Sequence, residues 1–237
     1  METVWLDLVQ WLHTAGLHLD AGWSRGVAQA AGAMDMPSLL ALAAALGWAS
    51  GFRLYAVVFL VGLMGAAGGV VLPAGLQVLQ HPAILIVSGF MLFMEFFADK
   101  IPGFDSLWDL MHSLIRVPAG AALAGAVFFG ADSGMMTLLA ALLGGTLAAT
   151  SQAAKTTTRA AINTSPEPFS NIGASLVEDG ASVGAIWLAT THPLVFGVLL
   201  AVVVVLMWIV TWTLIKFLRT AFRHLSQWRS AGQPRVA

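Results

Sequence analysis

Residues 90–105, FMLFMEFFADKIPGFD, place a carboxylate inside an otherwise apolar run. Glu95 lies among phenylalanines and methionines, and Asp99 follows four residues later, so both would share one face of a helix. An ionised acid at the centre of a bilayer costs about 2.5 to 3.5 kcal/mol on insertion scales. The two carboxylates therefore need a bound cation, a basic partner or a proton. The stretch predicts a membrane helix that ends on a functional or ion-paired motif.

The composition indicates a membrane protein. Of the 237 residues, 58% are hydrophobic and 10% are charged, and the mean hydropathy is +0.83, whereas soluble domains carry about 25% charged residues. The chain has no cysteine, which excludes disulfides and thiolate metal sites. Its basic residues form no large patch of the kind that binds nucleic acid. We therefore expect an all-α, polytopic protein of the bacterial inner (cytoplasmic) membrane, with the lipid bilayer as a partner and no nucleic acid.

The apolar runs predict about seven short spans, with broken or re-entrant segments, in a transmembrane domain over residues 38–217. Residues 38–67 are too long for one span, so we expect two short helices joined at Ser50-Gly51. Residues 104–116 carry apolar side chains on one side and polar ones on the other, which predicts a helix lying in the membrane interface. The other predicted spans are 83–97, 118–130, 138–150, 172–189 and 194–217, with a polar cytoplasmic stretch at 151–171.

The two ends of the chain differ in charge. Residues 1–37 are expected to form an amphipathic helix and a linker, without the basic start of a signal peptide. Five of the eleven Lys and Arg residues lie at or after residue 216, and residues 218–237 form a basic tail. The positive-inside rule then predicts a cytoplasmic C-terminus.

Two pairs of similar segments predict an internal repeat. The pairs are 39–53 with 138–155 and 90–100 with 174–184, and they would divide the domain into halves at 38–116 and 134–192. The first pair has a small-residue helix, a serine and then a cation, namely Ser50 with Arg53 and Ser151 with Lys155. The second pair has an apolar run broken by a Glu with a nearby Asp. Paired interruptions point to a midplane site in secondary transporters, although Ala-, Leu- and Gly-rich segments also align by chance, and a parallel or inverted relation stays open.

Charged residues that interrupt apolar segments, with the two serines at the breaks, are the candidate site for a substrate or ion. The set is Glu95, Asp99, Glu178, Asp179, Arg53, Lys155, Arg159, Ser50 and Ser151. Glu95 and Glu178 would lie in the substrate or proton path, and the cations would balance their charge. In the structural alternative, Asp99 marks the water boundary and Glu95 extends its side chain toward it. The structural alternative for residues 155–159, KTTTR, is a cytoplasmic surface turn.

Catalytic motifs do not occur in this sequence. The six histidines show no HxxH or HExxH spacing, and no Walker motif or GxSxG is present. We therefore expect no enzymatic activity, no catalytic residue and no cofactor, while metal binding stays undetermined.

Several of these motifs together resemble a known family. They are Arg53 in SGFRLY, the string EFFADKIP at 95–102 with Asp105 beyond it, Lys155 and Arg159, PFSN at 168–171, and Glu178-Asp179. In this order they resemble DUF4126, a bacterial membrane family of unknown function, over roughly residues 40–192. The family pattern implies a histidine where this chain has Gln152. The acidic string is also similar to the ExGDK signature of cation/proton exchangers for manganese or calcium, with Ala98 in place of the glycine and a spacing one residue longer.

The leading hypothesis from the sequence is a transporter or channel for a small ion or solute, coupled to a cation or proton through the intramembrane carboxylates. The alternative is a membrane scaffold or accessory subunit in which the same charges form buried structural ion pairs. A third, weaker hypothesis is a membrane enzyme that uses residues 155–159 to hold the phosphate of a lipid. Short spans with Gly- and Ala-rich faces also suggest a homo-oligomer.

Overall fold

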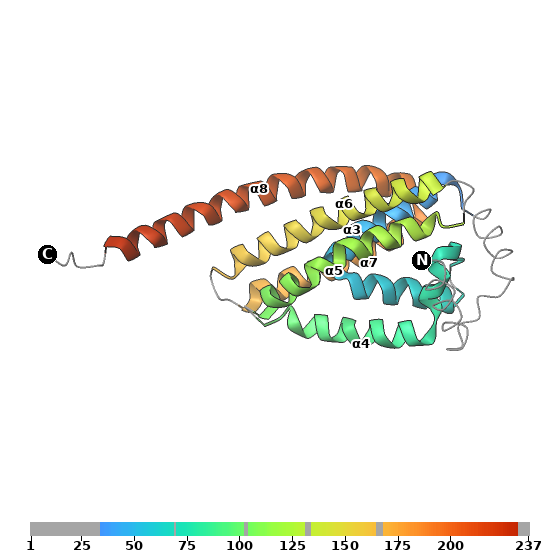
Figure 1. The fold of residues 1–237 in the computed structure, drawn as a ribbon, viewed down its shortest axis with the longest axis horizontal. Coiled ribbons are helices and arrows are strands. Elements are labelled where there is room, and N and C mark those ends of the chain that lie inside the picture. Colours follow the sequence, from blue (N-terminus) through green and yellow to red (C-terminus); the bar gives the residue numbers. More distant parts are fainter. Residues whose placement is uncertain (1–33, 69, 102–103, 131–133, 165–167, 232–237) are drawn as a thin grey trace, which may run out of the picture.

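In the computed structural model, the described residues are 34–68, 70–101, 104–130, 134–164 and 168–231. They form helices and no strand (Figure 1), which confirms the all-α prediction for this part of the chain. The helices are α3 (Met36–Ala66), η1 (Ala74–Gln80), α4 (Pro82–Ala98), α5 (Phe104–Val127), α6 (Gly134–Ile162), α7 (Pro168–Thr191) and α8 (Pro193–Ala231). The amphipathic helix expected within residues 1–37 lies almost entirely outside the described residues.

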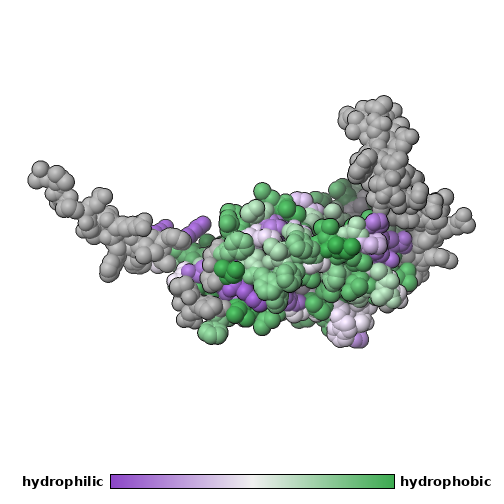
Figure 2. All heavy atoms as spheres, turned by 90° about the horizontal axis from the view of Figure 1, so that it is seen from below, coloured by the Kyte–Doolittle hydropathy of each residue, from purple (hydrophilic) through white to green (hydrophobic). Residues whose placement is uncertain are grey.

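Four described helices are long and apolar enough to cross a membrane, namely α3, α5, α6 and α8 up to Thr220. The pair η1 and α4, bent by 72°, would make a fifth if it acts as one broken span. Hydrophobic residues cover most of the face shown in Figure 2, and hydrophilic ones gather mainly toward its two ends. This architecture is that of a helical membrane protein, while the expected seven spans stay a prediction.

Helix α3 contains a sharp break at Arg53, whose backbone (φ −140°, ψ 68°) is not helical. Asp35 caps the start of the helix by accepting a hydrogen bond from the Ser38 backbone N–H at 3.2 Å. Hydrogen bonds from Ser38 keep the pKa of the exposed Asp35 carboxyl below its usual range. The sequence predicts the break at Ser50-Gly51, and the structure has it two residues later.

The two arms of α3 run in opposite directions. In the first arm, 36–52, Gly47 packs on Gly144 and Gly51 packs on Ser151, so this arm is parallel to α6. The second arm, 54–66, is antiparallel to α4, because Gly62 contacts Leu85 near the start of α4 while Phe59 contacts Gly89 farther along. Helices α4 and α6 point the same way, since each is antiparallel to α5 between them (Figure 1). Helix α3 is therefore a helical hairpin with Arg53 at its tip.

Helix α5 differs from the expected interfacial helix and separate short span. It continues through Pro118 as one helix, which membrane helices tolerate because neighbouring groups satisfy the freed carbonyl. Its polar side chains Asp109, His112 and Arg116 are buried, whereas Leu110 and Leu114 are exposed. The expected amphipathic pattern is present, but the polar face packs inside the protein and the apolar face points outward.

Helix α6 also extends beyond its predicted end. The sequence predicts a span at 138–150 followed by a polar cytoplasmic stretch, whereas the helix continues to Ile162. Lys155 and Arg159 consequently lie on an ordered helix and are buried. The alternative of a cytoplasmic surface turn at 155–159 is therefore wrong.

The internal repeat is not confirmed. The first pair of similar segments, in α3 and α6, runs parallel, whereas the second pair, in α4 and α7, runs antiparallel (Figure 1). A single rotation that relates one pair therefore does not relate the other.

Candidate functional site

A cluster of ion-paired side chains lies where α4 ends and α7 begins, around the tip of the α3 hairpin. This charge cluster consists of Arg53, Glu95, Asp99, Asp109, Arg116, Lys155, Arg159, Glu178 and Asp179. Five helices, α3 to α7, position these side chains, with Asp99 directly after the last residue of α4. All nine are buried except Asp179, whose side chain is 29% exposed. Burial of this many charges requires that each be paired.

Arg53 connects three helices through its guanidinium group. Its Nη1 pairs with an oxygen of Asp99 at the end of α4. Its Nε lies 2.7 Å from Asp179 on α7, and its Nη2 donates to the Ser175 hydroxyl at 2.7 Å. The break in α3 makes this possible, because the side chain at the tip of the hairpin projects into the cluster.

Lys155 lies between carboxylates of three different helices. Its ammonium is 3.1 Å from Asp99 and from Asp109, and 3.3 Å from Glu178. The same nitrogen donates to the Phe52 carbonyl at 3.2 Å, beside the break in α3. A lysine is a point charge with three donors, so this position suits contact with several acids at once.

Arg159 contacts both carboxylate oxygens of Glu178. Its Nη2 donates to both carboxylate oxygens at 3.1 Å. Its Nη1 donates to the backbone carbonyls of Asp99 and Asn171, at 3.0 and 3.1 Å. The guanidinium therefore holds the C-terminal end of α4 against the start of α7.

Arg116 forms the second part of the cluster, on α5. It donates to Glu95 at 2.5 Å, to Asp109 at 2.7 Å and to the Gln152 side-chain carbonyl at 3.0 Å. Asp109 also contacts Lys155 and so joins this part to the rest. Glu95 does not snorkel to water, as its side chain is fully buried.

The structure brings together seven of the nine predicted site residues. The other two, Ser50 and Ser151, make no hydrogen bond to the charged groups of the described residues, because each hydroxyl donates to a backbone carbonyl of α3. Ser50 donates to the Gly47 carbonyl at 2.7 Å, and Ser151 donates to the Trp48 carbonyl at 2.7 Å. We assign both serines to the close approach of α3 and α6 and not to the cluster itself.

Sequence reasoning missed Asp109 and Arg116. Their spacing of seven residues puts them on one helix face. The sequence predicts that this face of an interfacial helix points to water. Gln152, where a histidine was expected, is also in contact with the cluster and is buried. A charge count would have pointed to Arg116, because the predicted site holds four carboxylates and only three cations.

The cluster carries more acid than base. With all nine side chains ionised, four positive charges face five negative ones, which gives a net charge of −1. Lys100 lies beside the cluster, where it donates to the Phe96 carbonyl at 3.0 Å and its positive charge acts on Asp179 and Asp99. Among the described residues, three buried carboxylate oxygens have no hydrogen-bond partner, namely Glu95 Oε2, Asp99 Oδ1 and Asp109 Oδ2. An unsatisfied buried polar atom costs about 1–3 kcal/mol, so these three oxygens lower the stability of the folded state.

In the part of the chain that the structure describes, no three His, Asp or Glu side chains are arranged to hold a metal ion. The carboxylates of the cluster are instead separated by guanidinium and ammonium groups.

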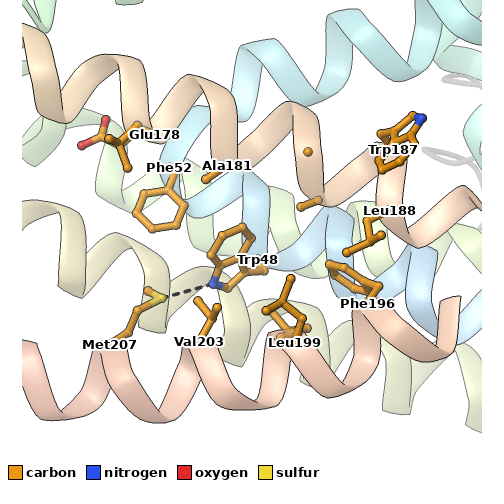
Figure 3. A pocket seen from close by; sticks show the side chains of 14 residues that line it. Trp48, Phe52, Glu178, Ala181, Trp187, Leu188, Phe196, Leu199, Val203 and Met207 are labelled. Atoms are coloured by element: carbon orange, nitrogen blue, oxygen red, sulfur yellow. Dashed lines mark hydrogen bonds between the residues drawn. The ribbon is translucent and has the colours of Figure 1, made fainter. Parts of the chain in front are cut away.

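An apolar pocket of about 540 Å³ lies beside the cluster, between α3, α7 and α8. Figure 3 shows Glu178 at one end of it and Trp187 toward the other. The indole N–H of Trp48 donates to the sulfur of Met207 at 3.3 Å, a weak acceptor, across the pocket. The pocket offers a route within the protein from an apolar surface to a carboxylate of the cluster.

Comparison with known proteins gives a family and no activity. A family model described as "Domain of unknown function (DUF4126)" matches residues 40–213. No curated protein and no solved structure matches the chain.

Proposed function

The chain belongs to the DUF4126 family, as its motifs predict, and we propose that it is a membrane transporter or channel for a small cation or a proton. The observation that carries the proposal is the buried charge cluster with one more carboxylate than cations, placed at the tip of the α3 hairpin.

The proposed transport cycle uses the extra negative charge. A proton or a small cation binds to the carboxylates and restores neutrality within the cluster, which lowers the cost of keeping them buried. Release of that ion on the opposite side returns the net charge to −1. Asp179 is the candidate acceptor in this scheme, since it is partly exposed and pairs with Arg53. Asp99 stays ionised, because three cations lie within ion-pair distance of it.

The α3 hairpin supplies a moving part for the cycle. Its tip is held by the polar contacts of Arg53 with Asp99 and Asp179, and by the packing of Leu54 in the apolar core. Broken helices at membrane depth line ion pathways in transporters, because unwound backbone is tolerated only where it faces protein or water. Protonation of Asp179 would weaken its contact with Arg53 and allow the tip to shift.

Reconstitution into liposomes tests the proposal. Purified protein in sealed vesicles is given gradients of protons, sodium, potassium, calcium and manganese in turn, with internal pH and ion indicators as readout. We expect flux of at least one ion, and we expect Asp99→Asn and Glu178→Gln to abolish it. Asp35→Asn is the matched control, since this exposed carboxylate at the start of α3 makes no ion pair that the structure describes.

Two outcomes would contradict the proposal. One is unchanged flux in the Asp99→Asn and Glu178→Gln proteins when both remain folded. The other is no flux above empty vesicles for any ion tested.

A second candidate function is a scaffold or accessory subunit without transport. The specific observation in its favour is the short, fully buried contact between Arg116 and Glu95, at 2.5 Å, which has no path to water. In that case Glu95→Gln would lower stability in detergent and the wild-type protein would show no ion flux.

Localisation and assembly are part of the proposal. Lys216, Arg219 and Arg223 gather toward the C-terminal end of α8, which supports a cytoplasmic C-terminus in a bacterial inner membrane. The exposed apolar side chains along α8 support a homo-oligomer or direct contact with lipid.

A further inference from the structure

A groove of about 480 Å³ lies between the C-terminal parts of α6 and α8, away from the charge cluster. Its lining combines two arginines and two threonine hydroxyls with apolar side chains. The residues are Thr156, Thr157, Ala160, Ile215, Leu218, Arg219 and Arg223. Both arginines are exposed, so nothing in the fold buries their charge.

The groove lies at the depth expected for lipid headgroups. The apolar run of α8 continues from Pro193 and reaches its first charged residue at Lys216. The groove therefore has its apolar floor, Ile215 and Leu218, at the end of that run, and its arginines one turn beyond. Acyl chains would meet the apolar part, and a headgroup would meet the guanidinium groups.

The polar atoms of the groove select for headgroup chemistry. Guanidinium groups bind phosphate oxygens through paired hydrogen bonds. The threonine hydroxyls already donate to the Gln152 and Ala153 carbonyls, at 3.0 and 2.7 Å. Their oxygens therefore face the groove as acceptors, which suits a headgroup that carries hydroxyl donors as well as a phosphate.

We propose that this groove binds one anionic glycerophospholipid with a hydroxylated headgroup, of the phosphatidylglycerol type, between α6 and α8. Arg219 and Arg223 hold the phosphate, the two threonine oxygens accept from the headgroup hydroxyls, and the acyl chains lie against Ile215 and Leu218. The bound lipid fastens the C-terminal part of α8 to α6, whose other face carries Lys155 and Arg159 in the charge cluster.

Native mass spectrometry of the purified full chain tests this proposal. The protein in neutral detergent is titrated separately with phosphatidylglycerol, with phosphatidylcholine and with inorganic phosphate. We expect retention of phosphatidylglycerol at concentrations at which phosphatidylcholine is not retained, and no competition by inorganic phosphate. Arg219→Gln should weaken retention by about tenfold, since a hydrogen bond to a charged group contributes about 1.5–3 kcal/mol.

Lys216→Gln is the matched control. It removes the same charge from the same helix, but the Lys216 ammonium lies over the Trp212 ring and not in the groove. An exposed charge outside the site changes free energy by less than about 0.5 kcal/mol, so retention should stay within about twofold of wild type. Unfolding temperatures without added lipid check that both variants fold.

Three results would overturn the assignment. Equal loss in Lys216→Gln and Arg219→Gln would indicate general attraction by a basic helix. Equal retention of phosphatidylcholine would remove the role of the negative charge. Displacement of the lipid by inorganic phosphate would indicate a site for free anions.

Discussion

Arg116 depends on its partners because none of them reaches water. Its guanidinium contacts Glu95 and Asp109, and all three side chains are fully buried. Removal of one member of a buried ion pair leaves the other charge uncompensated, which is more costly than the loss of the contact itself. The same reasoning applies to Arg53 and Arg159, so stability and any ion pathway share the same residues.

The substitution Arg116→Met is expected to destabilise the protein by about 3–5 kcal/mol, the cost of breaking a buried ion pair. Unfolding in a denaturing detergent, followed by circular dichroism, measures the change. The double variant Arg116→Met with Glu95→Gln should recover part of the loss, because it also removes one of the stranded charges. Lys216→Met on the exposed surface of α8 serves as the control, and a similar loss there would contradict the interpretation.

Residues of the cluster differed in how well the sequence revealed them. Glu95, Asp99 and Glu178 stand out because a charge in an apolar run is costly and needs a reason. Asp109 and Arg116 lie on a helix with an ordinary amphipathic pattern. That pattern fixes which residues share a face but not whether the face points to water or to the protein interior. In a membrane protein, a helix with its polar face toward water and a helix with its polar face toward the protein interior have the same sequence periodicity.

Helices α3, α5 and α6 pack closely because small residues line their contacts. A methyl group added at Gly47 would overlap the backbone of Gly144, and one added at Gly144 would overlap the side chain of Ala124. Small residues at such crossings allow backbones to approach and let dispersion forces act over the whole contact. This packing fixes the position of the first arm of α3 along α6, and hence the position of Arg53.

Gly47→Ala is expected to cost about 1–3 kcal/mol, as an overpacked core does. Gly180→Ala is a matched control, because a methyl group there would meet no atom within 4 Å, and alanine is favoured over glycine in a helix by about 1 kcal/mol. Denaturation midpoints of both variants should therefore move in opposite directions. A Gly47→Ala midpoint equal to wild type would show that the crossing is looser than the structure indicates.

The α3 hairpin also makes a prediction that distinguishes it from a straight span. Asp35 and Ala67, just outside its two ends and both exposed, should lie on the same side of the membrane. The chain has no cysteine, so Asp35→Cys and Ala67→Cys each introduce a single thiol. A membrane-impermeant maleimide added to intact spheroplasts should label both or neither.

Arg223→Cys, at the other end of the bundle (Figure 1), is the reference for the opposite side and should show the reverse result. Labelling of only one of positions 35 and 67 would mean that α3 crosses the membrane.

The sequence predicted two short helices over residues 38–67, joined at Ser50-Gly51 with Arg53 at an inner turn, but not which residues hold that turn. A serine and a glycine mark a weak point in a helix, and the observed break follows two residues later at Arg53. The reversal depends on acceptors from α4 and α7, through Asp99 and Asp179. Contacts between segments so far apart in sequence leave no local pattern.

At the scale of the whole molecule, the helices build one bundle in which a single level holds most of the buried charge. The ends of α4 and α6 and the starts of α5 and α7 meet at that level (Figure 1). Helix α8 lies along the outside of α6 and extends beyond the bundle toward the C-terminus. The charge cluster and the lipid groove therefore lie on two faces of the same helix, and a change in one can reach the other through α6.

The all-α class, the apolar helices and the family followed from composition and motifs, because these depend on single segments. The contacts between the helices did not, since they join segments that are far apart in the sequence. Which acid meets which cation depends on the arrangement of the helices. Glu95 pairs with Arg116, and Glu178 pairs with Arg159.

The position of Arg53 at the tip of α3 has a consequence for how the protein is made. The ribosome completes α3 before it synthesises Asp99, and long before Ser175 and Asp179 on α7. A newly made hairpin would hold a guanidinium group without any of these partners, so its insertion at that stage would carry a cost of about 2.5–3.5 kcal/mol on insertion scales. Helix α3, the first described helix in the sequence, is therefore expected to be among the last to reach its final position during biosynthesis.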